Sequence, residues 1–283
     1  GNAVNKTAGL LEELDLETVC DNARCPNRME SYSQQTATFM ILGNECTRPC
    51  SFCAVARGKP EALELDEPQR VAEAAYRLGL KHVVITSVTR DDLPDGGGEH
   101  FYQCVTAVRE KTGAWIEVLT PDFIHHPAGL ERVVQAAPEV FNHNTETVLR
   151  LQREIRTSAS YGRSLALLAR AKWANPNGLT KSGLIVGMGE TEEEVLGALA
   201  DLRAVGVDII TIGQYLRPTA RHRKIHRYVH PHEFERYRAF GSAIGIPHVE
   251  SGPLVRSSYH AKDATAAVPN ASAGVPVSIG KKP

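Results

Sequence analysis

The sequence lacks the features that mark several broad classes of protein. None of its apolar runs approaches the ~20 residues that a helix needs to cross a bilayer. The formal net charge is only −1, so bulk electrostatics predict neither nucleic-acid binding nor attachment to a membrane surface. The first residues, Gly-Asn-Ala-Val-Asn-Lys, contain neither an apolar secretory region nor an initiator Met. We therefore expect a trimmed or tagged start.

Cysteine is also scarce, and its six residues are not spread in the way of a disulfide framework. Five of them fall between residues 20 and 53, at spacings typical of metal ligands. This clustering argues against a small secreted domain held by disulfides and indicates a reducing cytoplasm. The sixth, Cys104, stands alone in an apolar helical stretch, where we expect a buried thiol.

The strongest positive signal is the motif Cys46-x3-Cys50-x2-Cys53, which follows the apolar run 36–43. Three thiolates on one short loop can hold a soft metal centre, as they do for zinc or an iron–sulfur cluster. A structural zinc site normally has four protein ligands, and no further Cys or His closes the set nearby. Three ligands leave one metal position open, which suits a four-iron cluster that binds a second molecule. A metal-binding scaffold without enzymatic activity is the alternative.

The order of the apolar segments predicts the fold class. Strands are expected at 36–43, 82–88, 114–119, 138–142, 181–187 and 208–216. Helical spacing of apolar residues predicts helices at 67–80, 98–112, 128–136, 145–155, 161–174, 191–205 and 231–244. The strand runs are mostly continuous, which is typical of strands buried on both faces of a parallel sheet. Because six units are too few for a complete barrel, the sequence predicts an α/β fold, a partial parallel (β/α)6 barrel.

The active site of such a barrel lies beyond the carboxyl ends of the strands. The cysteine loop follows the first predicted strand and therefore belongs to that face. Polar or glycine-rich segments follow four further strands, at 86–98, 142–146, 187–190 and 214–217. We expect these segments to meet the cysteine loop in space and to build one site with it.

These motifs resemble those of the radical S-adenosylmethionine (SAM) enzymes. The cysteine motif after a first strand is the signature of that superfamily, and residues 183–190 (G-L-I-V-G-M-G-E) are similar to its G-x-I-x-G-x-x-E segment. Within the superfamily, the sequence most resembles the lipoyl synthases over nearly all of residues 17–262. The segments that carry this resemblance are 36–53, 84–97, 141–144, 180–183, 213–216 and 252–260.

The resemblance implies a reaction, cofactors and partners. Lipoyl synthases insert sulfur at C6 and C8 of an octanoyl group bound to a lysine of a lipoyl carrier domain, either the glycine cleavage H protein or a 2-oxoacid dehydrogenase E2. They use SAM and two 4Fe–4S clusters, and the auxiliary cluster supplies the sulfur. An electron, from a donor such as ferredoxin or flavodoxin, cleaves SAM to methionine and a 5′-deoxyadenosyl radical. By resemblance, Cys46, Cys50 and Cys53 hold the SAM cluster.

The resemblance also assigns the auxiliary cluster to the two ends of the chain. The family holds this cluster with an N-terminal C-x4-C-x5-C motif and a serine of a C-terminal Arg-Ser-Ser-Tyr. Here Cys20 and Cys25 match the first two positions, and Ser258 is the expected serine ligand, with Ser257 as the runner-up. The third cysteine position holds Ser31, although its neighbours match the family without a gap. The two ends should therefore meet above the barrel mouth and shield it from water.

Ser31 weakens the case for a complete auxiliary cluster. A serine hydroxyl is harder to deprotonate than a thiol, and its hard oxygen is poorly matched to iron–sulfur iron. Three interpretations remain open: an engineered residue, a natural variant with altered or lost sulfur insertion, and a cluster that accepts serine ligation. A radical SAM enzyme without a functional auxiliary cluster is therefore the alternative function. The SAM-cleaving half does not depend on this position.

The loop positions indicate which residues hold SAM. The expected contacts are Thr86, Gly97, Glu99, Asn144, Glu146, Gly187 and Glu190. Glycines at 96–98 would let the backbone approach the methionyl group, although a loose turn explains them as well. Asn144 and Glu146 would hold the ribose or the substrate amide, or else begin a solvated helix. Thr191 and Glu194 predict a capping box for the helix that follows them.

A basic segment, 217–227, follows the last predicted strand on the active-site side. Lipoyl carrier domains tend to be acidic, so Arg221 and Arg223 are predicted to dock the carrier, with a solvated loop as the alternative. For the whole chain we expect an N-terminal extension at 1–35, the barrel at 36–245 and a C-terminal extension at 246–283. The last part of that extension, from residue 262, reads as a flexible tail.

Overall fold

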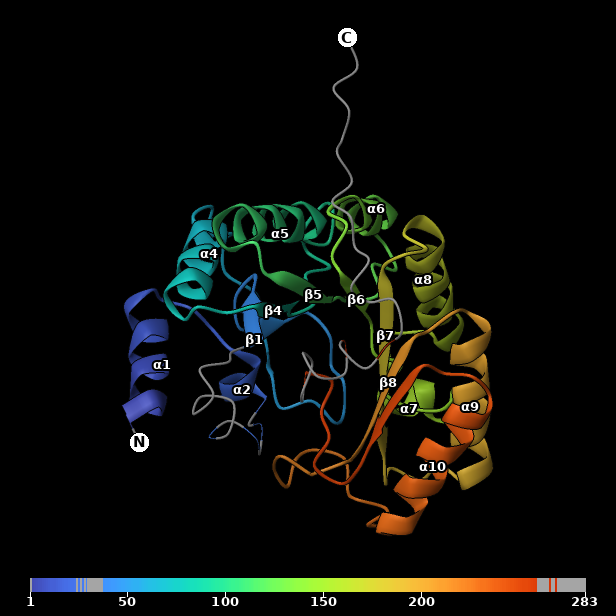
Figure 1. Ribbon diagram of the computed structural model, residues 1–283. Coiled ribbons are helices and arrows are strands. Elements are labelled where there is room, and N and C mark those ends of the chain that lie inside the picture. Colours follow the sequence, from blue (N-terminus) through green and yellow to red (C-terminus); the bar gives the residue numbers. More distant parts are fainter. Residues whose placement is uncertain are drawn as a thin grey trace.

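A parallel sheet of seven strands forms the centre of the structure, a computed structural model that describes residues 2–23, 25, 27, 29, 38–258, 265 and 268 (Figure 1). The strands are β1 Thr38–Ile41, β4 His82–Ser87, β5 Trp115–Leu119, β6 Val140–Asn142, β7 Leu179–Val186, β8 Ile209–Gln214 and β9 His248–Ser251. They lie side by side in this order, and every neighbouring pair is parallel. The predicted fold class, a partial parallel barrel, is confirmed.

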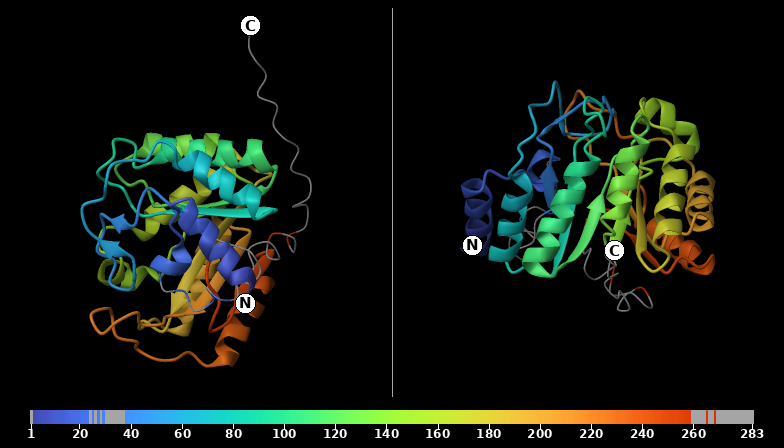
Figure 2. Two further views of the ribbon diagram at one scale, coloured as in Figure 1. Left: turned by 90° about the vertical axis from the view of Figure 1, so that its left-hand side faces the viewer. Right: turned by 90° about the horizontal axis from the view of Figure 1, so that it is seen from above.

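Helices connect the strands and form an arc around the outside of the curved sheet (Figures 1 and 2). The helices of the barrel are α4 Glu67–Arg77, α5 Gly98–Thr112, α6 Pro127–Gln135, η1 Leu149–Leu151, α7 Gln152–Ile155, α8 Tyr161–Ala174, α9 Glu192–Ala204 and α10 Pro231–Ala243. The capping box predicted for α9 is present, with both reciprocal hydrogen bonds between Thr191 and Glu194. None of the helices in the described residues has the length and apolarity to cross a bilayer.

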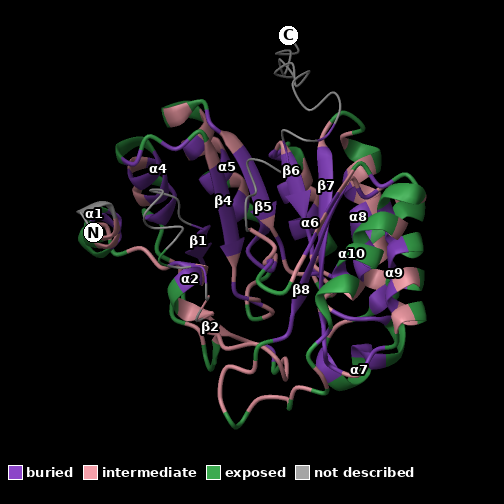
Figure 3. Ribbon diagram, turned by 60° about the horizontal axis from the view of Figure 1, so that its bottom comes forward, coloured by how far each residue is buried: buried purple, intermediate pink, exposed green. Residues whose placement is uncertain are grey.

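The core lies between the sheet and the helices. All four residues of β1 and all six of β8 are buried, as the continuous apolar runs predicted (Figure 3). Each helix turns one face toward the sheet; α4, for example, buries Val71, Ala72, Ala74 and Ala75. Complete burial of an aliphatic side chain stabilises a fold by about 1.5–3 kcal/mol, so this core fixes the positions of the strand ends.

The seventh strand, β9, was not predicted. His248–Ser251 contains a single aliphatic residue, Val249, and only its alternate residues are buried. A short strand at the edge of a sheet contacts one neighbour only, so it does not need the continuous apolar sequence of a central strand. The sheet thus continues past residue 245, into the segment expected to form the C-terminal extension.

The helix predicted at 145–155 begins four residues later than expected. The Glu146 N–H donates to the carbonyl of Gly183, and the Ile185 N–H donates to the carbonyl of Glu146. These bonds keep the chain beside β7, and Glu146 takes a left-handed backbone with φ of 65°. Helical structure starts only at Leu149. Polar side chains after β6 are therefore held against the sheet instead of projecting from a helix.

The N-terminal segment covers the free edge of the sheet with two unpredicted helices, α1 Asn2–Glu13 and α2 Val19–Asn22. Glu13 pairs with Arg77 of α4, beside which α1 lies in Figure 1. Thr18 forms an antiparallel bridge to Phe39 of β1. This contact occupies part of the outer edge of β1, which would otherwise present unpaired backbone groups. It also brings α2 next to the start of the cysteine loop.

A buried ion pair crosses the inside of the sheet. The Nζ atom of Lys181 on β7 lies 3.0 Å from an Oε atom of Glu117 on β5, and both side chains are fully buried. Asn142 of β6 donates a hydrogen bond of 2.8 Å to the same carboxylate. Burial would raise the pKa of Glu117, but the charge of Lys181 and the contact with His82 outweigh it and lower the pKa to about 2. Glu117 is therefore ionised in the folded protein.

Removal of one partner of this pair should destabilise the fold. Lys181→Met leaves the buried carboxylate of Glu117 without its lysine partner, and we expect the free energy of unfolding to fall by about 3–5 kcal/mol. Urea denaturation followed by circular dichroism measures this change. The double variant Lys181→Met/Glu117→Met should regain most of the loss, and the exposed Lys224→Met should be neutral. A loss in the single variant no larger than that of Lys224→Met would contradict the prediction.

Candidate active site

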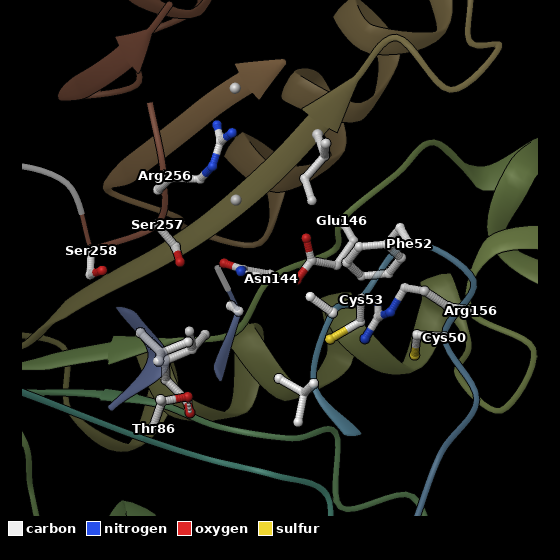
Figure 4. A pocket seen from close by; sticks show the side chains of 18 of the residues that line it. Cys50, Phe52, Cys53, Thr86, Asn144, Glu146, Arg156, Arg256, Ser257 and Ser258 are labelled. Carbon is white, nitrogen blue, oxygen red and sulfur yellow. Dashed lines mark hydrogen bonds between the residues drawn. The ribbon is translucent and has the colours of Figure 1, made fainter. Parts of the chain in front are cut away.

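A cavity of about 530 Å³ opens at the carboxyl ends of the strands. Residues in or just after six of the seven strands line it, so the loops meet as the sequence analysis expected. Two further segments complete the wall: Val19, Ala23 and Cys25 before the sheet, and residues 255–258 after it. Figure 4 shows the cysteine loop on one side of the cavity and the C-terminal serines on the other.

The three cysteines of the motif lie together on one wall. Cys46 belongs to β2 Glu45–Cys46, which pairs with β3 Ala56–Arg57 and so closes the loop that carries Cys50 and Cys53. Burial raises the pKa of the Cys50 thiol to about 11 and that of Cys53 to about 12. These thiols are therefore protonated in the metal-free chain, and metal binding must release their protons.

Arg48 fixes this loop to two neighbouring strands. Its guanidinium is almost fully buried and pairs with Asp91, which follows β4, at 2.7 Å and with Asp122, which follows β5, at 2.8 Å. A buried charge requires such partners, because desolvation without them costs several kcal/mol. The sequence analysis did not select Arg48, although its position inside the cysteine motif was a usable signal.

The basic segment holds the other end of the cysteine loop. The Nε2 atom of His222 lies 2.9 Å from the carbonyl of Cys53, and the Arg223 N–H donates to the carbonyl of Ser51 at 2.9 Å. The Arg223 guanidinium donates to the carbonyl of Met188 and pairs with Glu154. Arg223 is therefore engaged within the chain, whereas Arg221 is exposed. Of the two predicted docking residues, the structure leaves only Arg221 open to a partner.

A second group of polar side chains follows β6. Asn144 Nδ2 donates to Glu146 at 3.0 Å, and burial raises the pKa of the Glu146 carboxyl. The positive charge of Arg156 acts on both Glu146 and His143. Burial, together with that charge, lowers the pKa of His143 to about 4, so this imidazole is neutral. Neither Arg156 nor His143 was selected from the sequence as a site residue. His143 lies within the segment 142–146 that was expected at this face, whereas no motif surrounds Arg156.

Several oxygens in the wall have no hydrogen-bond partner among the described residues. The cavity-lining side chains concerned are Ser87, Thr120, Asp122 and Asn144. Buried polar groups normally have partners, and a group that lacks one invites a ligand. Amino and hydroxyl groups are the donors that such acceptors would take, so this part of the wall fits the amine and ribose of SAM.

The structure separates the predicted SAM contacts into two sets. Thr86, Asn144 and Glu146 line the cavity, whereas Gly97, Glu99, Gly187 and Glu190 do not. Gly97 immediately precedes α5, with φ of 88°, and packs against Leu42. Glu99 is exposed and pairs with Arg132.

The remaining two residues of the second set close the turn after β7. The Glu190 carboxylate accepts hydrogen bonds from the N–H groups of Gly187 and Met188, at 2.5 and 3.0 Å. Together with the positions of Gly97 and Glu99, this geometry gives all four residues a structural role, and their binding to SAM stays a prediction.

The opposite wall contains the predicted auxiliary ligands that the structure describes. Cys25, Ser257 and Ser258 line the cavity, and Cys20 lies in contact with Cys25. A hydrogen bond from Cys20 lowers the pKa of Cys25 to about 6, aided by the charge of Arg256. The Asn27 side chain donates to the carbonyl of Leu254 at 3.0 Å, so the two ends of the chain touch here. Ser31 lies outside the described residues. Of the tail predicted from residue 262, the structure describes only Thr265 and Val268, and both are buried. Val268 packs against Val140, Leu179 and Ile209, so the prediction of a flexible tail is wrong for these two residues.

The donor set on the first wall fits an iron–sulfur cluster. Three soft thiols face a cavity, and they do not converge on a single metal position among the described residues. A four-iron cluster takes one thiolate at each ligated iron, so its ligands surround a cube and not a point. Cys46, Cys50 and Cys53 would hold such a cluster, and three protein ligands would leave one of its irons open to a second molecule.

Comparisons with known proteins agree with this geometry. Residues 40–214 match the family model of the radical SAM superfamily, to which the chain therefore belongs. Three similar proteins, all named lipoyl synthase, come from Rhodopirellula baltica, Caldanaerobacter subterraneus and Rubrobacter xylanophilus. They are 58%, 53% and 56% identical over 93%, 91% and 89% of this chain and 84%, 91% and 79% of their own length. Within the superfamily, the chain is a member of the lipoyl synthase family.

Solved structures support the fold alone, since their sequence identity is low. SuiB of Streptococcus suis, bound to S-adenosylmethionine, gives a TM-score of 0.60 at 13% identity, over 83% of this chain and 56% of SuiB. Coproporphyrinogen III oxidase of Escherichia coli gives 0.52 at 16% identity, over 73% of this chain and 52% of the oxidase. The part of each of these two proteins that matches this chain is thus about half of its length.

Loss of any one thiol of the motif should prevent stable cluster assembly. We expect anaerobically reconstituted Cys46→Ala, Cys50→Ala and Cys53→Ala to contain about four fewer irons per chain than the parent protein. Each thiolate binds one iron, and a cluster that lacks one of its three ligands would not assemble stably. Iron and sulfide analysis measures this loss. Cys104→Ala is the matched control, since Cys104 is fully buried in α5 and does not line the cavity. Equal iron in all four variants would refute the assignment.

Proposed function

We propose that the chain acts as a lipoyl synthase, which inserts sulfur at C6 and C8 of an octanoyl group bound to a lysine of a lipoyl carrier domain. The observation that carries the proposal is a single cavity with the cysteine motif on one wall and the auxiliary residues on the other. Membership of the lipoyl synthase family supports it. Saturated C–H bonds have no acidic proton, so a radical route suits this chemistry.

The space between the two walls suits an octanoyl chain. The side chains there include Met40, Val55, Leu119, Leu184, Ile185 and Val255, all of them apolar. An aliphatic chain gains about 0.8 kcal/mol for each CH₂ group that it buries, so such a wall would hold eight carbons without any charged contact. The polar groups after β6 lie beside this space and remain available for SAM.

Cys46, Cys50 and Cys53 would hold the SAM cluster, which would supply the electron for the reductive cleavage of SAM and so allow hydrogen to be removed from the substrate. The contribution of this chain is to bind and orient. We assign the SAM carboxylate to Arg156, because this buried cation lines the cavity and lies near Glu146. Asn144 and Asp122 each present an unpaired oxygen that would accept hydrogen bonds from the amine or the ribose.

The auxiliary donor set is incomplete for a second cluster of the same kind. Cys20 and Cys25 supply two thiols, and Ser257 and Ser258 supply only hydroxyls. Ser31 replaces the third thiol, and an oxygen is a poor ligand for iron–sulfur iron. SAM cleavage is therefore expected to exceed sulfur insertion in this chain. The second candidate function, a radical SAM reaction without an auxiliary cluster, rests on this substitution.

The proposed reaction requires a substrate protein and an electron donor. The substrate is an octanoylated carrier, either a glycine cleavage H protein or a 2-oxoacid dehydrogenase E2. The reducing electron would come from a ferredoxin or flavodoxin. Because all six cysteines are free thiols, a reducing cytoplasm is the compartment that we propose for the reaction.

The variant Ser31→Cys tests the function. After anaerobic reconstitution, we expect both proteins to form 5′-deoxyadenosine from SAM, and we expect Ser31→Cys to raise the yield of dithiolated octanoyl-lysine peptide at least tenfold. Mass spectrometry measures both products. Iron content should rise from about four to about eight atoms per chain, since one further thiolate completes the auxiliary site. Absence of deoxyadenosine from both proteins would refute the proposed function.

The exposed Arg221 tests carrier docking. Arg221→Glu should raise the KM for an octanoylated carrier domain by roughly threefold to tenfold, because reversal of a rim charge weakens attraction to an acidic partner. It should spare deoxyadenosine formation with a short octanoyl-lysine peptide. Lys81→Glu is the matched control, since the exposed Lys81 precedes β4 and lies at the opposite end of the strands. Equal losses on both substrates would contradict docking through Arg221.

A further inference from the structure

Two neighbouring thiols, Cys20 and Cys25, lie at the wall of the cavity. Cys20 lies in the short helix α2, and Cys25 follows it after one further turn. The Cys25 N–H donates to the carbonyl of Cys20 at 3.1 Å, and this bond closes the turn and brings the two side chains together. The two thiols lie close enough for the interaction with Cys20 to lower the pKa of the Cys25 thiol. A disulfide requires this kind of close approach of two side chains.

The chain supplies no third thiol to this pair. Cys46, Cys50 and Cys53 lie on the opposite wall, and Cys104 is fully buried in α5. Position 31, which would complete the family motif, is a serine. The residues present therefore do not fit the auxiliary cluster that the family implies. What remains is a pair of neighbouring thiols.

The two thiols differ in their access to the cavity. Cys25 lines the cavity beside Arg256, Ser257 and Ser258. Cys20 does not line it and is only 4% exposed. A small molecule in the cavity can therefore reach the sulfur of Cys25, whereas the sulfur of Cys20 is reached only through Cys25. This arrangement of one accessible and one shielded thiol is that of an attacking and a resolving cysteine in thiol–disulfide exchange.

From these contacts we infer that Cys20 and Cys25 form a reversible dithiol–disulfide pair in the wall of the active-site cavity. The oxidant is a small disulfide, RSSR. The Cys25 sulfur attacks one sulfur of RSSR, the S–S bond breaks, and the released RS⁻ takes the proton of Cys25. The Cys20 sulfur then attacks the Cys25 sulfur of the mixed disulfide and expels the second RS⁻, which takes the proton of Cys20. Two protein thiols are oxidised and one RSSR is reduced to two RSH.

This pair goes beyond the proposed function and does not require it. In the disulfide state neither sulfur can bind iron, because only a free thiolate is a metal ligand. The SAM wall is untouched, since its three cysteines take no part in the exchange. The redox state of the pair would therefore decide whether the auxiliary wall can bind iron at all.

The experiment uses the full chain with its reconstituted SAM cluster, equilibrated without oxygen in glutathione buffers of graded ratio. Free thiols are alkylated and the protein is digested with trypsin. Cleavage after Arg24 places Cys20 in peptide 7–24 and Cys25 in peptide 25–28, so the disulfide joins two separate peptides. We expect at least tenfold more linked peptide in oxidised than in reduced glutathione, with full return to thiols on reduction.

Two single variants separate the roles of the thiols. Cys20→Ser should accumulate a glutathione adduct on Cys25, because the resolving thiol is absent. Cys25→Ser should carry at least tenfold less adduct on Cys20, because that thiol is shielded. Cys104→Ala should behave like the parent chain. In Ser31→Cys, linked peptide should fall as iron content rises.

Three results would overturn the inference. The first is an absence of linked peptide at every glutathione ratio while both cysteines remain open to alkylation. The second is a disulfide that joins Cys25 to a cysteine of the SAM motif. The third is protection of both cysteines from alkylation in a chain that binds about eight irons, which would make them cluster ligands. Deoxyadenosine formation, measured on the same samples, reports separately on the proposed function.

Discussion

The parallel hydrogen bonding of the seven strands is the constraint on which the site depends. Because every strand points the same way, the loops that carry functional side chains all leave the same edge of the sheet. Curvature of the sheet turns that edge into a rim around one cavity. Residues from the beginning, the middle and the end of the chain thus meet at this rim, although they are far apart in the sequence. The chain ends need only close the rim, which they do where Asn27 binds Leu254.

The cysteine loop requires more than its place on this edge. A loop with three thiols would be mobile unless other groups fixed its backbone, and a cluster needs all three at once. Arg48 anchors its middle to the loops after β4 and β5, and His222 and Arg223 bind the carbonyls of Cys53 and Ser51. The same basic segment therefore limits the freedom of the loop, and this explains why Arg223 is not available to a partner. A cation that fixes the cysteine loop is not free to bind a partner protein.

The sequence was sufficient where a local pattern determines the structure. The continuous apolar runs predicted β1 and β4 to β8, and the cysteine spacing predicted a cavity wall with three thiols. The sequence did not predict the features that depend on tertiary contacts. β9 forms because β8 offers an edge, Glu146 is held beside β7 because Gly183 accepts its N–H, and Glu99 turns away from the cavity toward Arg132. Asp122 acquires a role only through Arg48, which is distant in the sequence, and Arg156 only because the chain folds back after β6 and brings it near Glu146.

The two walls of the cavity are chemically independent, and this determines what Ser31 can change. The three thiols of the SAM wall, Cys46, Cys50 and Cys53, all lie C-terminal to position 31 in the sequence, so the replacement of a thiol at position 31 leaves this donor set unchanged. On the other wall, a cluster depends on all of its ligands at once, whereas a disulfide needs only two sulfurs. One oxygen in place of sulfur therefore weakens the first possibility and leaves the second unaffected. The contact between Cys20 and Cys25 is the part of the auxiliary site that survives the substitution.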